Sequence, residues 1–166
     1  EIDTKRKRKG GNLVDVSILV APIVHGGKPM GDYAIYRDIT ERKKAEEELY
    51  LKKTYLEKLF NSAPEAIVWH DNNDIVVNVN DEFTTMFGYT REEAIGRPIN
   101  ELVAPEKLKD EASMFSHNVI HGKRVEADSI RKRKDGSLFN VSILGDPIIH
   151  EGKQIREYAI YRDITA

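Results

Sequence analysis

Tyr33-Ala34-Ile35-Tyr36-Arg37-Asp38-Ile39-Thr40 occurs twice in this chain, returning letter for letter as Tyr158-Ala159-Ile160-Tyr161-Arg162-Asp163-Ile164-Thr165. Aligning the two copies at an offset of 125 residues extends the match back to Glu1 against Glu126, with 25 identities among 40 aligned pairs. A repeat at a fixed period indicates how a chain is divided into units. Residues 41–165 therefore form one whole period, and residues 1–40 match the end of a preceding one.

This division predicts a domain fragment followed by a complete domain. We expect residues 1–40 to be the C-terminal half of a preceding domain, residues 41–60 to be a helical linker, and residues 61–166 to be a complete domain. A chain of 166 residues has room for one domain of ordinary size with such an appendage.

The composition is that of a well-solvated, nearly neutral protein, with 33% charged residues and a formal net charge of −2. This balance gives no reason to expect a nucleic-acid partner. The absence of cysteine excludes disulfides, thiolate metal sites and cysteine nucleophiles. No apolar run approaches the roughly 20 residues that a membrane span needs. We therefore expect a cytoplasmic module, whose longer parent protein could still be anchored in a membrane.

Residues 1–40 have the pattern of three strands joined by turns. The expected strands are Lys5–Lys9, Asn12–Ala21 and Asp32–Ile39, and Pro22 is expected to end the second of them. Strand, turn and strand in succession predict an antiparallel meander. Forty residues of meander cannot bury a sizeable core alone, so we expect this segment to need a partner.

A helix is expected from Glu41 to about Phe60, with Thr40 as its N-cap. Two interpretations of this helix are open, a solvated connector and a short coiled coil between two copies of the chain. The thin apolar stripe favours the coiled coil, because such a helix is marginally stable alone. The stripe consists of Ala45, Leu49, Leu56, Leu59 and Phe60.

The remaining residues predict a complete α+β domain. Strands are expected at 66–70 and 75–79, followed by a short helix over 82–87 that Asn80 or Asp81 caps. Thr90 and Glu93 form a capping box, and Pro105 begins a longer helix over about 106–120. Three strands follow at 124–134, 137–146 and 155–164. A two-plus-three antiparallel sheet with short helices on one face is therefore the expected architecture.

Several of these motifs together resemble the PAS domain family. Asn78-Val79-Asn80-Asp81-Glu82-Phe83 and 87–97 resemble the central signature of PAS domains, and Arg133-Lys134-Asp135-Gly136-Ser137 resembles the turn between their third and fourth strands. Asp163-Ile164-Thr165 matches the Asp-Ile-Thr ending of PAS sensors. The resemblance covers residues 56–165 as a full domain and residues 1–40 as the second half of another.

The resemblance implies a five-stranded antiparallel sheet whose concave face, closed by the short helices, can hold a ligand. PAS domains are common as tandem repeats in sensor histidine kinases of two-component systems and phosphorelays, where they often dimerise and act through helical linkers. The resemblance thus implies a sensory module in signal transduction that binds a small molecule or a neighbouring PAS or kinase domain. The alternative is a structural dimerisation and spacer module without a ligand.

Structural or signalling roles are expected for residues at two kinds of position. Asn80 is expected to cap the helix that follows it. The two Asp-Ile-Thr motifs end a strand, where a carboxylate and a hydroxyl can bind the first free N–H groups of the following segment and fix its direction. Their members are Asp38, Ile39 and Thr40 in the first copy and Asp163, Ile164 and Thr165 in the second.

A ligand pocket is one of two interpretations of the aromatic and apolar residues in the complete domain, and a filled core is the other. The pocket candidates are Trp69, Phe83, Met86, Phe87, Phe115 and Tyr161. Flavin–cysteine photochemistry is excluded because the chain has no cysteine. Haem-binding members carry a histidine near the position of Ala112, which argues against a haem of that type.

No catalytic or metal site is expected. His117 and His121 have the i, i+4 spacing of metal ligands, but no cysteine or obvious carboxylate completes the set. The basic runs Lys5–Lys9 and Arg131–Lys134 are interpreted as solvated strands, whose charge opposes edge aggregation. Because residues 1–40 and 126–165 nearly coincide, either copy could complete the sheet beside 66–79. We therefore expect a homodimer, with exchange of residues 1–40 as one possible arrangement.

Overall fold

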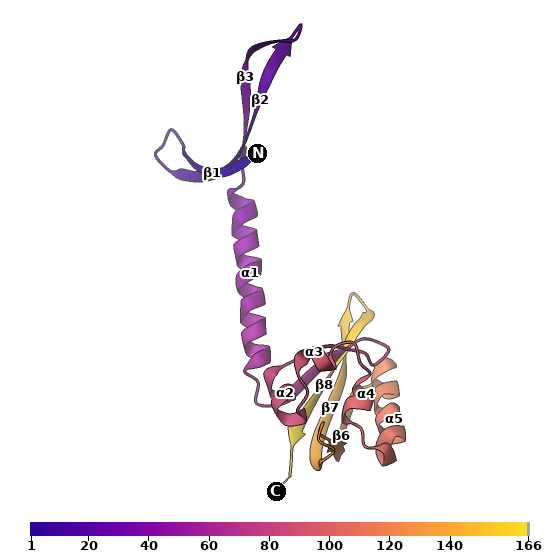
Figure 1. Ribbon diagram of the computed structural model, residues 1–166. Helices are drawn as coiled ribbons and strands as arrows, with labels where there is room; N and C mark the ends of the chain where they lie inside the picture. The colour runs from indigo at the N-terminus through magenta and orange to yellow at the C-terminus, as the bar shows by residue number, and fades with distance from the viewer. Residues whose placement is uncertain (166) are drawn as a thin grey trace. The chain divides into compact units, whose positions relative to one another are not determined.

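The computed structural model describes residues 1–165, which fall into two compact units (Figure 1). The first unit comprises Glu1–Leu56, and the second begins at Glu57. Helix α1 (Thr40–Asn61) contains the boundary between them.

The first unit carries a three-stranded antiparallel meander in the order β1-β2-β3. Its strands are β1 (Ile2–Lys7), β2 (Leu13–His25) and β3 (Lys28–Asp38), which confirms the three expected strands. Pro22 lies inside β2, opposite Asp32, and the expectation that it ends the strand is wrong. Because β1 pairs with β2 only as far as Ile18, the edge beside Pro22 is open and its missing N–H removes no inter-strand hydrogen bond.

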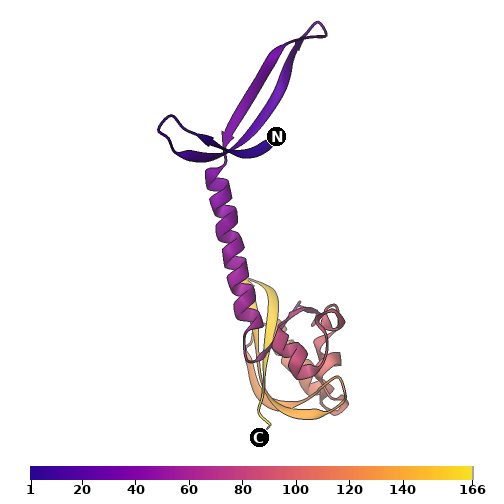
Figure 2. The ribbon, with the colours of Figure 1, turned by 60° about the vertical axis from the view of Figure 1, so that its left-hand side comes forward.

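The second unit is a five-stranded antiparallel sheet in the order β5-β4-β8-β7-β6, with the short helices on one face. Figure 2 shows the sheet curving around these helices. The architecture predicted from the sequence is confirmed. The strands are β4 (Ala66–His70), β5 (Val76–Val79), β6 (Val125–Lys132), β7 (Leu138–His150) and β8 (Lys153–Asp163). The helices are α2 (Asp81–Phe87), α3 (Arg91–Ala94), α4 (Ile99–Val103), the 3₁₀ turn η1 (Glu106–Leu108) and α5 (Lys109–Ile120).

The boundaries of α2 and α3 are set by the local signals expected. The Asn80 side chain caps α2, and Gly88 ends that helix in the left-handed conformation, with φ of 79°. Thr90 and Glu93 form the capping box of α3. Pro105 is different, because it precedes the 3₁₀ turn η1 and the α-helix begins only at Lys109.

The core lies between the inner face of the sheet and the helices. Strand residues facing inward alternate with outward ones, so β4 contributes Ala66 and Val68, and β8 contributes Ala159 and Tyr161. Phe87 is fully buried at the centre and makes ring contacts with three other aromatic side chains. This packing fixes α2 against the second half of the domain.

Within the described chain, β8 rather than β3 pairs with β4, so residues 1–40 do not complete the five-stranded sheet. The expectation of completion by residues 1–40 within the chain is therefore wrong for this structure. One position explains the choice. A Cβ at Gly145 would lie 3.0 Å from Cγ2 of Val119 on α5, and the first copy has Val20 at the aligned position. Val20 would crowd α5 at that point.

Candidate functional site

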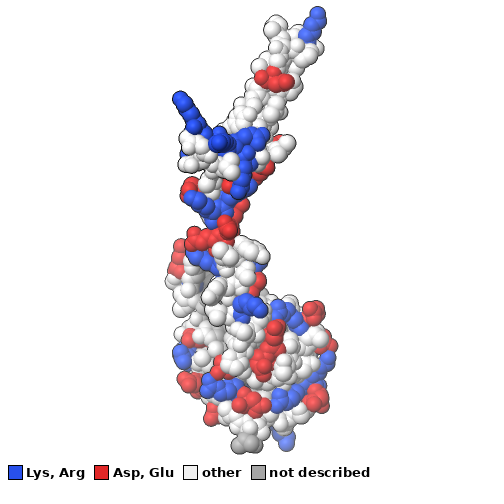
Figure 3. All heavy atoms as spheres, turned by 90° about the vertical axis from the view of Figure 1, so that its left-hand side faces the viewer, with Lys and Arg blue, Asp and Glu red and all other residues white. Residues whose placement is uncertain are grey.

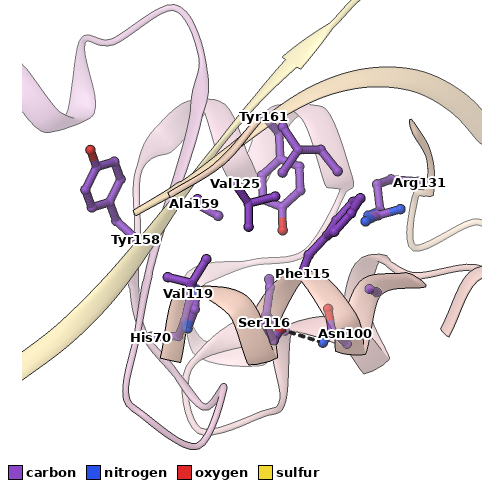
Figure 4. Close-up of a pocket in the computed structure, with 14 residues that line it drawn as sticks. His70, Asn100, Phe115, Ser116, Val119, Val125, Arg131, Tyr158, Ala159 and Tyr161 are labelled. Atoms are coloured by element: carbon purple, nitrogen blue, oxygen red, sulfur yellow. Dashed lines mark hydrogen bonds between the residues drawn. The ribbon is translucent and has the colours of Figure 1, made fainter. Parts of the chain in front are cut away.

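A small cavity lies between α5 and the inner face of the sheet (Figure 4). Its volume is about 40 Å³, which is room for about three water molecules or a ligand of a few heavy atoms. Phe115, Ser116 and Val119 line it from α5, while Arg131 and Tyr161 line it from β6 and β8. The polar groups of these walls determine what the cavity can bind.

Arg131 is a buried cation in the cavity wall, with only 2% of the residue exposed. Its Nη1 donates to Glu111 Oε1 at 3.1 Å and to Ser129 Oγ at 2.8 Å. Its Nε is buried and has no hydrogen-bond partner within residues 1–165. The interpretation of 131–134 as a solvated strand is therefore wrong for Arg131, because the alternation of β6 turns this residue inward.

The first basic run behaves differently. Lys5 to Lys9 are exposed in the first unit, as the solvated interpretation expected, and Figure 3 shows the basic side chains of this unit at its surface. The same sequence pattern therefore has two different environments in the two copies, exposed in the first and buried at Arg131 in the second.

Tyr161 brings a second polar group to the cavity. Its side chain is nearly fully buried, and burial raises the pKa of its hydroxyl to about 12. In Figure 4 the Tyr161 hydroxyl and the ring of Phe115 face the same space, with Arg131 beside Phe115. Asn100 Nδ2 donates to Ser116 Oγ at 2.9 Å, the dashed line of Figure 4.

The structure places only two of the six pocket candidates around this cavity, Phe115 and Tyr161. Three others belong to the packed core, namely Phe83, Met86 and Phe87. Trp69 is half-buried and packs on Phe60, with ring centroids 4.6 Å apart. The aromatic residues are therefore mainly core, and polar residues give the cavity its chemistry.

The Asp-Ile-Thr motif at the end of β8 forms a compact hydrogen-bonded junction. Asp163 Oδ1 accepts from the Thr165 backbone N–H at 2.9 Å, and Asp163 Oδ2 pairs with Arg133 Nη2 at 3.0 Å. Hydrogen bonds from Thr165, together with the Arg133 guanidinium, lower the pKa of Asp163. The backbone N–H of Asn140 in β7 donates to Thr165 Oγ1 at 3.2 Å, so the motif is also bound to β7.

The first copy has the same junction at the start of α1. Asp38 Oδ1 accepts from the Thr40 backbone N–H at 2.9 Å, and Asp38 also pairs with Arg8. Ile39 donates its N–H to the Asp15 carbonyl at 2.9 Å. Thr40 is the first residue of α1, and its hydroxyl has no partner in the described chain. The capping expected of the Thr40 side chain is therefore wrong, and at the start of α1 the Asp38 carboxylate binds the Thr40 N–H.

Asn80 has a wider role than capping α2. Its Oδ1 accepts from Phe83 N at 3.0 Å and from Ile67 N at 2.8 Å. Its Nδ2 donates to the carbonyls of Phe60 at 3.1 Å and Glu65 at 2.9 Å. One fully buried side chain thus joins the last turn of α1, the start of β4 and the start of α2.

Three ionisable residues that the sequence did not single out lie together inside the domain. They are His70 in β4, Asp74 in the β4–β5 turn and Glu157 in β8. Burial, and then the Asp74 carboxylate, raise the pKa of Glu157 to about 7, whereas burial lowers the pKa of His70. A signal was available for two of them, because Glu157 shares the inward alternation of Ala159 and Tyr161, and His70 shares that of Ala66 and Val68.

His117 and His121, by contrast, are exposed at the end of α5. Their ring centroids lie 4.1 Å apart, and His121 Nδ1 lies 2.7 Å from the His117 carbonyl oxygen. No carboxylate ion-pairs with either of them among residues 1–165. Two exposed imidazoles at this separation form a surface site that competes for added metal ions.

The curved antiparallel sheet, its helical cover and the cavity between them define an α+β domain of the sensory type. The chain belongs to the PAS domain family, whose model matches residues 64–166. No helix within residues 1–165 is long and apolar enough to cross a membrane.

Solved structures and curated relatives agree with this assignment. The PAS domain of an HTR-like protein from Haloarcula marismortui is 28% identical, covers 74% of this chain and 99% of its own, and superposes with a TM-score of 0.63. The blue-light photoreceptor of Listeria innocua is 25% identical over 119 residues, 70% of this chain and 47% of that protein. Sensor protein FixL of Bradyrhizobium diazoefficiens is 25% identical over 109 residues, 63% of this chain and 22% of that protein. The chain thus spans less than half the length of these curated relatives.

Proposed function

We propose that this chain is a regulatory sensor module that binds a small molecule in the cavity of its PAS domain and does not itself catalyse a reaction. The observation that carries the proposal is the buried Arg131 Nε in the wall of the cavity, which has no hydrogen-bond partner among residues 1–165. Buried polar groups normally have partners, and leaving one unpaired costs about 1–3 kcal/mol. A ligand that accepts from Arg131 Nε would relieve this cost, and the Tyr161 hydroxyl faces the same space as a second donor.

The cavity also limits the class of ligand. A volume of about 40 Å³ admits a molecule of a few heavy atoms, and a buried guanidinium favours an acceptor that carries negative charge. A short carboxylate fits both conditions. Larger cofactors of PAS sensors do not fit the residues present, because the chain has no cysteine to bond a flavin and Ala112 offers no ligand to a haem iron.

The route from the cavity to the end of the domain is short. Tyr161 stands two residues before Asp163 on β8, so a ligand held by Tyr161 acts directly on the strand that leads to the Asp-Ile-Thr junction. The proposed output is a change in the direction of the helix that follows such a junction, read by a neighbouring module such as a histidine kinase. The names of the two curated relatives, a photoreceptor and a sensor protein, support a signalling role.

Acetate is the probe we would use to test ligand binding. Acetate is expected to raise the melting temperature of the wild-type chain, and Tyr161→Phe is expected to weaken its binding about 3- to 10-fold, because the variant lacks one hydrogen bond. Titration calorimetry and thermal shift measure both effects, with acetamide as the neutral probe of similar size. Tyr36→Phe is the matched control, since Tyr36 is the exposed counterpart of Tyr161 in the repeat.

The result of this test also decides between the two interpretations of the module. Binding that is equal in wild type and Tyr161→Phe would contradict the proposed site. If acetate and acetamide leave the melting temperature unchanged, and the native mass is a simple multiple of the chain mass, the ligand-free spacer module is supported instead.

We also propose that α1 pairs with the α1 of a second copy. None of its residues is buried in the core, and its apolar stripe follows the a and d positions of a heptad. Leu49 and Leu56 stand at a, Ala45 and Leu59 stand at d, and Lys52 takes the remaining d position. Leu49, Leu56 and Leu59 are each at least 60% exposed in the single chain, so pairing would remove apolar surface from water.

Replacing Leu49 and Leu56 together by glutamate is expected to convert a dimer into a monomer, because four carboxylates would face one another across the seam. Size-exclusion chromatography with light scattering measures the mass in solution. Leu51→Glu is the control, since Leu51 is 58% exposed but lies off the stripe. A dimer that survives the double substitution would point to exchange of residues 1–40, and a monomeric wild type would contradict both arrangements.

A further inference from the structure

His70, Asp74 and Glu157 converge from three separate segments on one point inside the domain. His70 Nδ1 lies 3.5 Å from Glu157 Oε2 and 3.6 Å from Asp74 Oδ1. All three atoms lie within 4.8 Å of one another. His70 is 4% exposed and Glu157 is fully buried, so this point is inside the protein.

The three atoms have no hydrogen-bond partners. Five buried side-chain polar atoms are unpartnered within residues 1–165, and three of the five are His70 Nδ1, Asp74 Oδ1 and Glu157 Oε2. The separations of 3.5 and 3.6 Å exceed the 2.7–3.2 Å of ordinary hydrogen bonds. The side chains are thus gathered without satisfying one another.

We propose that these three side chains bind one divalent transition-metal ion of the Zn²⁺ type, through His70 Nδ1, Asp74 Oδ1 and Glu157 Oε2. Zn²⁺ binds histidine nitrogen and carboxylate oxygen at about 2.0–2.2 Å. Two such ligands on a tetrahedral ion lie about 3.4 Å apart, close to the two measured separations. The set leaves one coordination position for water.

The electrostatics of the cluster favour a cation. Two carboxylates beside one another with little water repel, and Asp74 contributes to the raised pKa of Glu157. A divalent ion would balance both charges and would accept the lone pair of a neutral imidazole, the form that burial favours for His70. One ion therefore satisfies all three unpartnered atoms.

The backbone holds the three ligands in place. His70 and Glu157 are directly paired residues of β4 and β8. Asp74 has a positive φ of 63° and is fixed by two backbone hydrogen bonds, from its N–H to the Asp71 carbonyl at 3.0 Å and from Ile99 N–H to its carbonyl at 2.9 Å. The other Glu157 oxygen, Oε1, accepts from Gln154 Nε2 at 2.9 Å, which orients the carboxylate as the neighbours of metal ligands commonly do.

An ion at this point would connect β4, the β4–β5 turn and β8. Because β8 continues to the Asp-Ile-Thr junction six residues after Glu157, metal occupancy would stiffen the strand that carries the proposed signal. Its three donor atoms are distinct from Arg131 Nε and the Tyr161 hydroxyl, and His70 also lines the cavity proposed for the acetate-type ligand.

The test uses the full chain, freed of metal with EDTA, and titrates it with ZnCl₂ in a buffer that does not chelate. His117→Ala and His121→Ala are introduced together as the background, because the exposed pair is the obvious competing site for added zinc. We expect one equivalent of Zn²⁺ to bind and, at 100 times Kd, to raise the melting temperature by about 10 °C. Glu157→Gln is expected to weaken binding at least 100-fold.

Asp32→Asn is the matched control. Asp32 is the exposed counterpart of Glu157 in the repeat and should bind no metal, so this substitution should leave zinc binding unchanged. A second measurement leaves all three ligand residues unsubstituted, so that the proposal is tested even if Glu157→Gln fails to fold. Bound Co²⁺ should give the visible absorption of a tetrahedral ion and should broaden the amide resonances of His70 and Glu157. Zinc binding that disappears with the two surface histidines, or that Glu157→Gln leaves unchanged, would overturn the proposal.

Discussion

Replacing Asn80 by alanine is expected to lower the free energy of unfolding of the PAS domain by about 3–5 kcal/mol. The substitution removes four hydrogen bonds made by one fully buried side chain. Loss of a helix N-cap alone costs about 0.5–2 kcal/mol, and each buried group left unpaired costs about 1–3 kcal/mol. Urea unfolding followed by the fluorescence of Trp69, the single tryptophan, reports on this domain.

Two further asparagine variants show where the loss comes from. Asn78→Ala is the control, because Asn78 is half-buried and its side chain accepts only from the adjacent Val79 N–H, so a loss below about 1 kcal/mol is expected. Asn80→Asp keeps both acceptor bonds and loses the two donated to Phe60 and Glu65. The loss of unfolding free energy for Asn80→Asp should therefore lie between the losses for Asn78→Ala and Asn80→Ala. Amide hydrogen exchange should accelerate in the last turn of α1. Equal losses for Asn78→Ala and Asn80→Ala would refute the proposed role of Asn80 as the joint between α1 and the domain.

The features that could be predicted from the sequence were those set by neighbouring residues. The capping box of Thr90 and the stop at Gly88 each depend on a few adjacent positions, and the structure has them where expected. The five-stranded sheet followed from the duplicated strands together with the resemblance to PAS domains. Local rules failed where the decisive contact is with another element. Pro22 is tolerated because β1 is short, and the Thr40 hydroxyl does not cap α1, while Asp38 binds the Thr40 N–H.

The chemistry of the interior could not be predicted from local sequence. Arg131 stands in a basic run that reads as a solvated strand, and only the packing of α5 on β6 and the pairing with Glu111 make it a buried cation. His70 and Glu157 are separated by most of the domain in sequence, and strand pairing alone makes them neighbours. Aromatic residues were the obvious pocket candidates, but bulk and apolarity describe core residues equally well. Polar residues in inward-facing strand positions are the better signal.

Replacing Phe87 by alanine is expected to lower the free energy of unfolding by about 3–5 kcal/mol. This is a large part of the roughly 5–15 kcal/mol by which a typical domain is stable. Phe87 is fully buried and its ring centroid lies 4.8 Å from Phe83, 5.5 Å from Phe139 and 5.2 Å from Tyr161. The ring therefore connects α2 to β7 and β8, and its loss removes both buried apolar area and these edge contacts. The melting temperature should fall by roughly 15–20 °C.

A cavity left by Phe87→Ala would be apolar and adjacent to Tyr161, so benzene should bind the variant and recover part of the lost stability, as apolar cavities of this kind allow. The wild-type chain should show no such gain. Phe115→Ala is the control of identical chemistry, because Phe115 is half-buried and its removal should cost only about 1–2 kcal/mol. A Phe87→Ala loss no larger than that of Phe115→Ala would mean that the interior collapses around the missing ring, and α2 would then be held to the sheet mainly by its backbone bonds, such as Lys134 N–H to the Phe87 carbonyl at 2.8 Å.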